Sequence, residues 1–142
     1  MRLELKALLA AGVLCVGAGV AQAQYSDGVI KIGVMNDQSG LYADLTGQGS
    51  VWAAKKAVED FCKATKCAKI EVVFADHQNK PDIGSNVVRQ WYDVDKVDVV
   101  VDVPTSSVAL AVNEIVRQKN KVFLISGAAA SNLTGDKCSP NT

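Results

Sequence analysis

The sequence has no surplus of charge of either sign, since 15 Lys and Arg residues balance 15 Asp and Glu residues. It offers no basic field to hold a phosphate backbone, so we expect no nucleic-acid partner. Histidine occurs once, at His77 in the polar stretch 76–82, where we expect it to be solvated. Neither a P-loop nor a G-x-S-x-G nucleophile elbow is present. The sequence therefore predicts no enzyme activity, no cofactor and no metal site.

A long apolar run occurs only near the start of the chain. Ala7–Val20 carries no charge, but it is shorter than the roughly 20 residues that cross a bilayer. It follows a weakly positive start and precedes an A-x-A sequence that ends at Ala23. This arrangement is typical of a secretory signal peptide. We therefore expect a signal peptide over residues 1–23, cleavage after Ala23, and export of a mature domain formed by residues 24–142.

Three cysteines remain after that cleavage: Cys62, Cys67 and Cys138. Disulfides persist in exported proteins, and Cys62 and Cys67 are close enough in sequence to close a small loop at a helix end. Two unpaired thiols or a zinc site are the alternatives, although C-x4-C with one remote histidine fits zinc spacing poorly. Cys62 and Cys67 therefore form a possible disulfide, and Cys138 has no assigned partner.

Short apolar runs alternate with amphipathic segments along the mature chain. The runs predict four strands, and apolar residues at helical spacing predict three helices between them. The strands are expected at Ile30–Met35, Ile70–Ala75, Val97–Val101 and Lys121–Ile125. The helices are expected over Gly49–Ala64, with Phe61 in the buried stripe, from Pro81 to Val94, with Val94 in the buried stripe, and over the periodic residues from Val108 to Val116. This βαβαβαβ order, with strands apolar on both faces, predicts an α/β fold with a doubly wound parallel sheet.

Ligands of such sheets bind beyond the carboxyl ends of the strands. Three loops expected there are rich in hydroxyl, amide and small residues: Asn36–Gly47, Asp102–Ser107 and Ser126–Ser131. Ser39 and Tyr42 lie in the first loop, where the Tyr42 ring could cover a ligand. An exposed loop tyrosine without a role is the alternative. The third loop has almost no side-chain bulk, so a ligand could touch its main chain, unless it serves only for close packing.

Thr105, Ser106 and Ser107 come directly before the third expected helix. Their hydroxyls and the free N–H groups of the first helical turn would converge on one spot, which favours a carboxylate or another small anion. The alternative is that Ser106 is a simple N-cap.

Several stretches together resemble the leucine/isoleucine/valine-type solute-binding proteins of ABC importers, which have the type I periplasmic binding fold. The matching stretches are Ile30–Val34, Asp37–Gly40, Asp76–Asp82, Val97–Val101, Pro104–Ser107 and Ser126–Ala129. The resemblance implies a periplasmic protein of two doubly wound lobes that closes over a small carboxylate-bearing solute and presents it to a membrane permease.

In this family the first lobe holds the ligand carboxylate in the loops that here contain Ser106, Ser107, Ala128 and Ala130. Amino-acid binders usually carry a threonine late in the second of these loops to meet the ligand ammonium, whereas here Ala130 is followed by Ser131. That departure favours an aromatic or aliphatic organic acid over a branched-chain amino acid. The candidate ligand-binding residues are Ser39, Tyr42, Thr105, Ser106, Ser107, Ala128, Ala130 and Ser131.

Members of this family are more than twice as long as this chain of 142 residues. We therefore expect residues 24–142 to be an incomplete first lobe, a fragment of a binding protein. A ligand-sensing domain of a receptor or regulator with the same fold is the alternative, and an exported α/β enzyme is a third possibility that the missing catalytic set disfavours.

Overall fold

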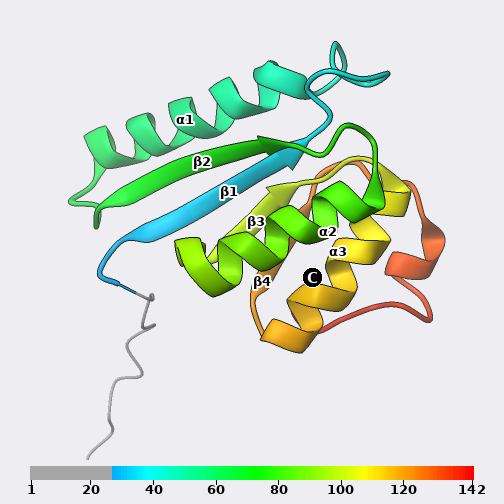
Figure 1. The fold of residues 1–142 in the computed structure, drawn as a ribbon. Helices are drawn as coiled ribbons and strands as arrows, with labels where there is room; N and C mark the ends of the chain where they lie inside the picture. The colour runs from blue at the N-terminus through cyan, green and yellow to red at the C-terminus, as the bar shows by residue number, and fades with distance from the viewer. Residues whose placement is uncertain (1–26) are drawn as a thin grey trace, which may run out of the picture.

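Four parallel strands form the sheet of this protein, whose computed structural model describes residues 27–142 (Figure 1). They are β1 (Ile30–Asn36), β2 (Ile70–Asp76), β3 (Val99–Asp102) and β4 (Val122–Ile125). Their order in the sheet is β2-β1-β3-β4, and every neighbouring pair is parallel. The predicted parallel α/β sheet is confirmed. The signal peptide expected over residues 1–23 lies outside the described residues.

Helices cover both faces of the sheet. Helix α1 (Gly47–Ala64) lies on one face, and α2 (Pro81–Gln90) and α3 (Ser106–Lys119) lie on the other (Figure 1). A π-helical turn, η1 (Trp91–Asp95), continues α2, and a short 3-10 helix, η2 (Ser131–Leu133), follows β4. The observed strands lie within about two residues of the predicted bounds, the usual uncertainty of element ends. Of the helices, α2 ends earlier than predicted, at Gln90, where η1 takes over, and α3 continues past Val116 to Lys119. Within residues 27–142, no helix has the length and apolarity to cross a membrane.

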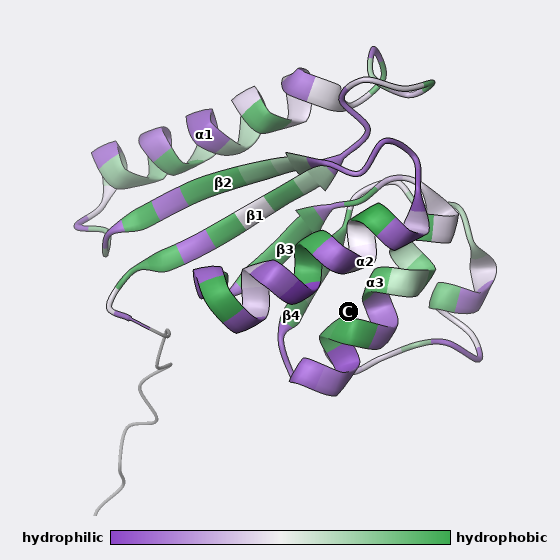
Figure 2. Cartoon of the chain, in the orientation of Figure 1, coloured by the Kyte–Doolittle hydropathy of each residue, from purple (hydrophilic) through white to green (hydrophobic). Residues whose placement is uncertain are grey.

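The core lies between the sheet and the pair α2 and α3, where apolar residues line the facing surfaces (Figure 2). Val100 of β3 and Phe123 of β4 are fully buried there. The ring of Trp91 packs directly on β1, because a Cβ atom at Gly33 would lie only 2.4 Å from it. Val94 was expected in the buried stripe of α2 but is 61% exposed. The π-helical turn that begins at Trp91 changes the helical phase and turns Val94 outward.

The face that carries α1 is covered less completely. Helix α1 packs on β1 and β2, so Val51 is buried while Phe61, expected in the same buried stripe, is 53% exposed. Val122 and Leu124 pair with Val99 and Val101, the β3 residues that alternate with buried Val100, and therefore point to the α1 side. They are 49% and 58% exposed. An apolar part of the sheet thus stays open beside α1.

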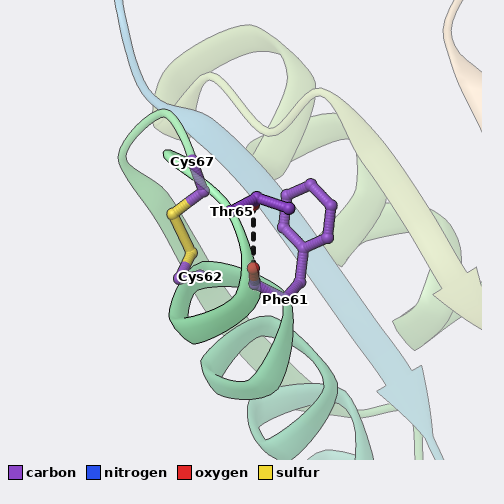
Figure 3. The surroundings of a disulfide bond; sticks show 4 residues. All are labelled: Phe61, Cys62, Thr65 and Cys67. Carbon is purple, nitrogen blue, oxygen red and sulfur yellow. Dashed lines mark hydrogen bonds between the residues drawn. A yellow bond between two sulfur atoms is a disulfide. The ribbon is translucent and has the colours of Figure 1, made fainter.

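A disulfide joins Cys62, in the last turn of α1, to Cys67, in the segment that leads to β2 (Figure 3). Thr65 ends the helix between them. Its backbone N–H and its hydroxyl both donate to the carbonyl oxygen of Phe61, at 3.0 and 2.8 Å. The covalent loop therefore closes around a hydrogen-bonded helix end. Cys138 is an exposed free thiol.

Candidate functional site

A cleft of about 860 Å³ opens at the carboxyl ends of the strands. The loop that follows each strand contributes to its lining: Tyr42 and Leu45 after β1, Asn79 after β2, Pro104–Ser107 after β3, and Ser126 and Gly127 after β4. The volume lies in the range of small-molecule sites, and the position is where open α/β sheets bind their ligands. The cleft is therefore the candidate site.

Four of the predicted residues lie together in this cleft: Tyr42, Thr105, Ser106 and Ser107. The backbone N–H of Ala129 donates to Ser106 Oγ at 3.1 Å, which ties the loop after β4 to the first turn of α3. Helix α3 begins at Ser106, its N-cap is Thr105, and no side chain caps it. Simple N-capping by Ser106 is therefore wrong, because its hydroxyl is engaged across the cleft instead.

The other four predicted residues do not line the cleft. Ser39 donates to the Asp76 carboxylate at 2.5 Å. Ala128 and Ala130 pack partly against the core and line a separate hollow of about 410 Å³ beside β4. Ser131 is exposed at the start of η2. Ala128 and Ala130 thus pack beside β4 rather than in the cleft, and contact of these four residues with a ligand stays a prediction.

Sequence reasoning missed a buried hydrogen-bond network at the cleft floor that centres on Asp102. Asn36 Nδ2 donates to Asp102 Oδ2 at 2.9 Å and to the carbonyl of Gly47 at 2.8 Å. The Ser126 hydroxyl donates to the other oxygen of Asp102. Asp102 and Val103 both have left-handed backbone conformations, with φ of 80° and 47°. One carboxylate thus ties together the ends of β1, β3 and β4, and the signal in the sequence is an aspartate directly after an apolar strand.

Two other carboxylates fix the loop that carries Tyr42. Asp37 is buried and accepts the backbone N–H groups of Gly40 and Tyr42 at 2.8 and 2.9 Å. Asp76 accepts the N–H groups of Gln38 and Gln78. Burial tends to raise the pKa of the Asp76 carboxyl, but the donated hydrogen bonds hold it below its usual value. Asp37, within the loop, and Asp76, at the end of β2, therefore both hold the first residues of the loop in place.

The expectation that His77 is solvated is wrong, because its side chain is completely buried. Its Nδ1 accepts the backbone N–H of Asn79 at 3.0 Å, and Nε2 has no hydrogen-bond partner within residues 27–142. Gly84 of α2 lies beside His77, and because a Cβ atom there would come within 2.6 Å of Val108, the absence of a side chain lets α2 pack closely on α3. Burial lowers the pKa of His77 below its usual value, against the attraction of nearby carboxylates.

The described part of the chain has no cluster of three or more His, Cys, Asp or Glu residues that could hold a metal ion. The cleft instead offers hydroxyls, backbone N–H groups at a helix start, one tyrosine ring and apolar side chains. Such a set can bind a small anion that has an apolar part.

Comparison with known proteins agrees with this geometry. The chain matches the model of the family described as periplasmic binding proteins over residues 29–142. It is similar to a solved periplasmic binding protein of Burkholderia mallei, with 44% identity, 82% of this chain covered and a TM-score of 0.78. No curated protein matches the chain.

Two further solved structures are similar. A periplasmic ligand-binding protein of a branched-chain amino acid ABC transporter from Burkholderia xenovorans LB400 has 38% identity, 79% of this chain covered and a TM-score of 0.74. An ABC transporter solute-binding protein of R. palustris in complex with benzoate has 25% identity, 80% of this chain covered and a TM-score of 0.72. The chain spans only 31%, 30% and 31% of the lengths of these three structures. The family match and the 44% identity place the chain in the periplasmic binding protein family.

Proposed function

We propose that this chain provides part of the first lobe of a solute-binding protein that serves an ABC importer, and that its cleft holds a small carboxylate. The observation that carries the proposal is the hydrogen bond between Ser106 Oγ and the Ala129 N–H. It gathers the first turn of α3 and the loop after β4 at one cleft, where unpaired backbone donors favour a negative charge. Proteins of this family are binding proteins of transporters and act outside the cytoplasm. A signal peptide over residues 1–23 would direct the chain to the periplasm.

The remainder of the ligand would lie against the apolar part of the cleft. Tyr42, Leu45 and Pro104 line it together with the hydroxyl groups, so the cleft suits a molecule with one anionic and one apolar end. A benzoate-type acid and a branched-chain amino acid both fit that description, and the similar structures include a benzoate complex and a branched-chain amino acid transporter protein. An amino acid would also need an acceptor for its ammonium group. Among the described cleft residues the only carboxylate is Asp102, whose oxygens already accept hydrogen bonds from Asn36 and Ser126. We therefore propose an aromatic or aliphatic organic acid as the ligand, handed on to a membrane permease.

Heteronuclear NMR of the purified chain tests this proposal. Benzoate, isoleucine and the neutral analogue benzamide are titrated in turn, and amide shifts are followed at Thr105, Ser106, Ser107 and Ala129. Benzoate should shift these amides in a saturable way, isoleucine should shift them less, and benzamide should leave them unchanged. Equal shifts with benzamide, or no shifts with either benzoate or isoleucine, would remove the carboxylate site. Larger shifts with isoleucine than with benzoate would instead favour an amino-acid ligand.

A further inference from the structure

The turn between β2 and α2 brings a buried histidine to the rim of the cleft. We propose that His77 is a positioning residue that holds Asn79 at the cleft through a hydrogen bond to its neutral imidazole, and that protonation of His77 releases this rim and weakens ligand binding. The part that concerns the ligand rests on the proposed function. The part that concerns the turn stands on the structure of the chain alone.

The turn depends on His77 for its shape. Gln78 and Asn79 are both left-handed, with φ of 51° and 56°. Asparagine tolerates this conformation, but it is costly for Gln78 unless other contacts hold it. Two hydrogen bonds close the turn: the Asn79 N–H donates to His77 Nδ1 at 3.0 Å, and the Lys80 N–H donates to the His77 carbonyl at 2.8 Å. The His77 N–H in turn donates to the Asn36 carbonyl at 2.9 Å. The side chain thus holds a backbone arrangement that would otherwise be costly.

The same turn is coupled to two walls of the cleft. Asn79 lines the cleft itself. Asp76 Oδ1 accepts the Gln78 N–H at 2.7 Å and the Gln38 N–H at 2.9 Å, so the turn and the start of the Tyr42 loop share one carboxylate oxygen. A change in the turn at residues 78 and 79 therefore reaches both Asn79 and the loop after β1.

Only the neutral imidazole can make the hydrogen bond that is observed. Because Nδ1 accepts, a neutral His77 carries its proton on Nε2. Protonation would place a second N–H at Nδ1, pointing at the Asn79 N–H, so two donors would face each other across 3.0 Å. Asp37, Asp76 and Asp102 are the charged groups that act on the ring. They favour its protonated form, but all three carboxylates already accept hydrogen bonds from other groups.

The pH range follows from the sign of the shift. Burial lowers the pKa of His77 in the folded chain, so an unfolded chain binds the proton more readily. The contribution of neutral His77 to the stability of the folded chain is therefore complete above about pH 6.5, the ordinary pKa of histidine. It is lost as the pH falls from there through the lower pKa that His77 has in the folded state. We expect the turn to open as the pH falls below about 6.5 and through the lower pKa of His77 in the folded chain.

NMR of the wild-type chain without ligand tests the turn directly. At about pH 7.5 the ¹⁵N shifts of His77 should identify the Nε2–H tautomer, and the Asn79 amide should be protected from hydrogen exchange. At a lower pH, at which its own ¹⁵N shifts show His77 to be protonated, both signals should have moved with one shared midpoint, while the amide of Ala57, exposed near the middle of α1, stays unchanged. An Nδ1–H tautomer at neutral pH, or an Asn79 amide that ignores the titration of His77, would overturn the proposal.

Two variants separate the acceptor from the charge. His77→Asn keeps an oxygen close to the position of Nδ1 and cannot be protonated in this range, so its Asn79 amide should stay protected at both pH values. His77→Gln carries its polar atoms one bond farther from the backbone, so its Asn79 amide should exchange with solvent at both pH values. If the two variants behave alike in hydrogen exchange, the Nδ1 acceptor has no special role.

Benzoate affinity provides the functional readout. In the wild type the dissociation constant should rise about fivefold between about pH 7.5 and the lower pH at which His77 is protonated, the effect expected for one lost hydrogen bond, whereas in His77→Asn it should stay within about twofold. An equal rise in both proteins would contradict control of the rim by His77. Absence of benzoate binding at neutral pH would contradict the proposed function, while the hydrogen-exchange result would still decide the role of His77 in the turn.

Discussion

Ser106 and Ala129 meet at the cleft, 23 positions apart in the sequence, through one hydrogen bond of 3.1 Å between a hydroxyl oxygen and a backbone nitrogen. The bond fixes the loop after β4 against the start of α3. The double change Ser106→Ala and Ser107→Ala removes this acceptor and two hydroxyls from the cleft. We expect it to weaken carboxylate binding by at least about tenfold, or 1.4 kcal/mol, as measured by calorimetry with benzoate.

Ser85→Ala on α2 is the matched control, because Ser85 lies outside the cleft. Its affinity for benzoate should equal that of the wild type. If the double variant also binds like the wild type, Ser106 and Ser107 do not take part in the site.

Asp102 organises the cleft floor, and replacing it should cost stability. Asp102→Asn tolerates the left-handed backbone but loses the charge that both Asn36 and Ser126 approach with donors. We expect the free energy of unfolding in urea to fall by about 2 kcal/mol. Asp44→Asn, at an exposed position in the loop after β1, should leave it within about 0.5 kcal/mol of the wild-type value. A similar small change for Asp102→Asn would show that its hydrogen bonds contribute little.

Two glycine positions should respond to alanine in opposite directions. At Gly33 a Cβ atom would lie 2.4 Å from the Trp91 ring, so Gly33→Ala should destabilise the fold by about 3 kcal/mol. At Gly49, inside α1, a Cβ atom meets nothing within 4 Å. Gly49→Ala should therefore stabilise the helix by up to about 1 kcal/mol. Urea midpoints measure both, and equal midpoints for the two variants would contradict the close packing of Trp91 on β1.

The Cys62–Cys67 disulfide constrains the end of α1. Closing so short a loop reduces the entropy of the unfolded chain, so Cys62→Ser together with Cys67→Ser should lower the free energy of unfolding by about 2 kcal/mol. Thermal unfolding of the double variant measures this effect. Cys138→Ser should keep the wild-type Tm, since Cys138 is exposed and outside the disulfide. A double variant as stable as the wild type would mean that the bond adds nothing to the fold.

The sequence predicted the elements of this fold well because periodicity is a local property. Apolar runs such as Val99–Val101 and the spacing of residues along α3 require only neighbouring residues to be interpreted. The three loops at the strand ends were also predicted, and all three contribute residues to the cleft. The order β2-β1-β3-β4 depends on pairing between distant segments, which no local pattern reports.

The misjudged residues are those whose surroundings come from elsewhere in the chain. His77 lies in a polar turn, yet its side chain is buried beside Gly84 of α2, a contact that the local sequence does not reveal. Asp102 becomes the centre of a network only when β1 and β4 flank β3. Val94 points outward because a π-helical turn shifts the phase of a helix whose sequence reads as regular. Tertiary contact and backbone irregularity, rather than residue type, decided each case.

The open apolar area around Val122 and Leu124 also affects how unfolding of this chain should be monitored. A hydrophobic dye such as ANS should bind there and fluoresce while the chain is still fully folded, because such dyes respond to poorly hydrated surface whether or not a core has loosened. Dye fluorescence would then give a false sign of denaturation. The near-ultraviolet circular dichroism of Trp91, whose buried ring packs on Gly33 of β1, is the better reporter of intact packing.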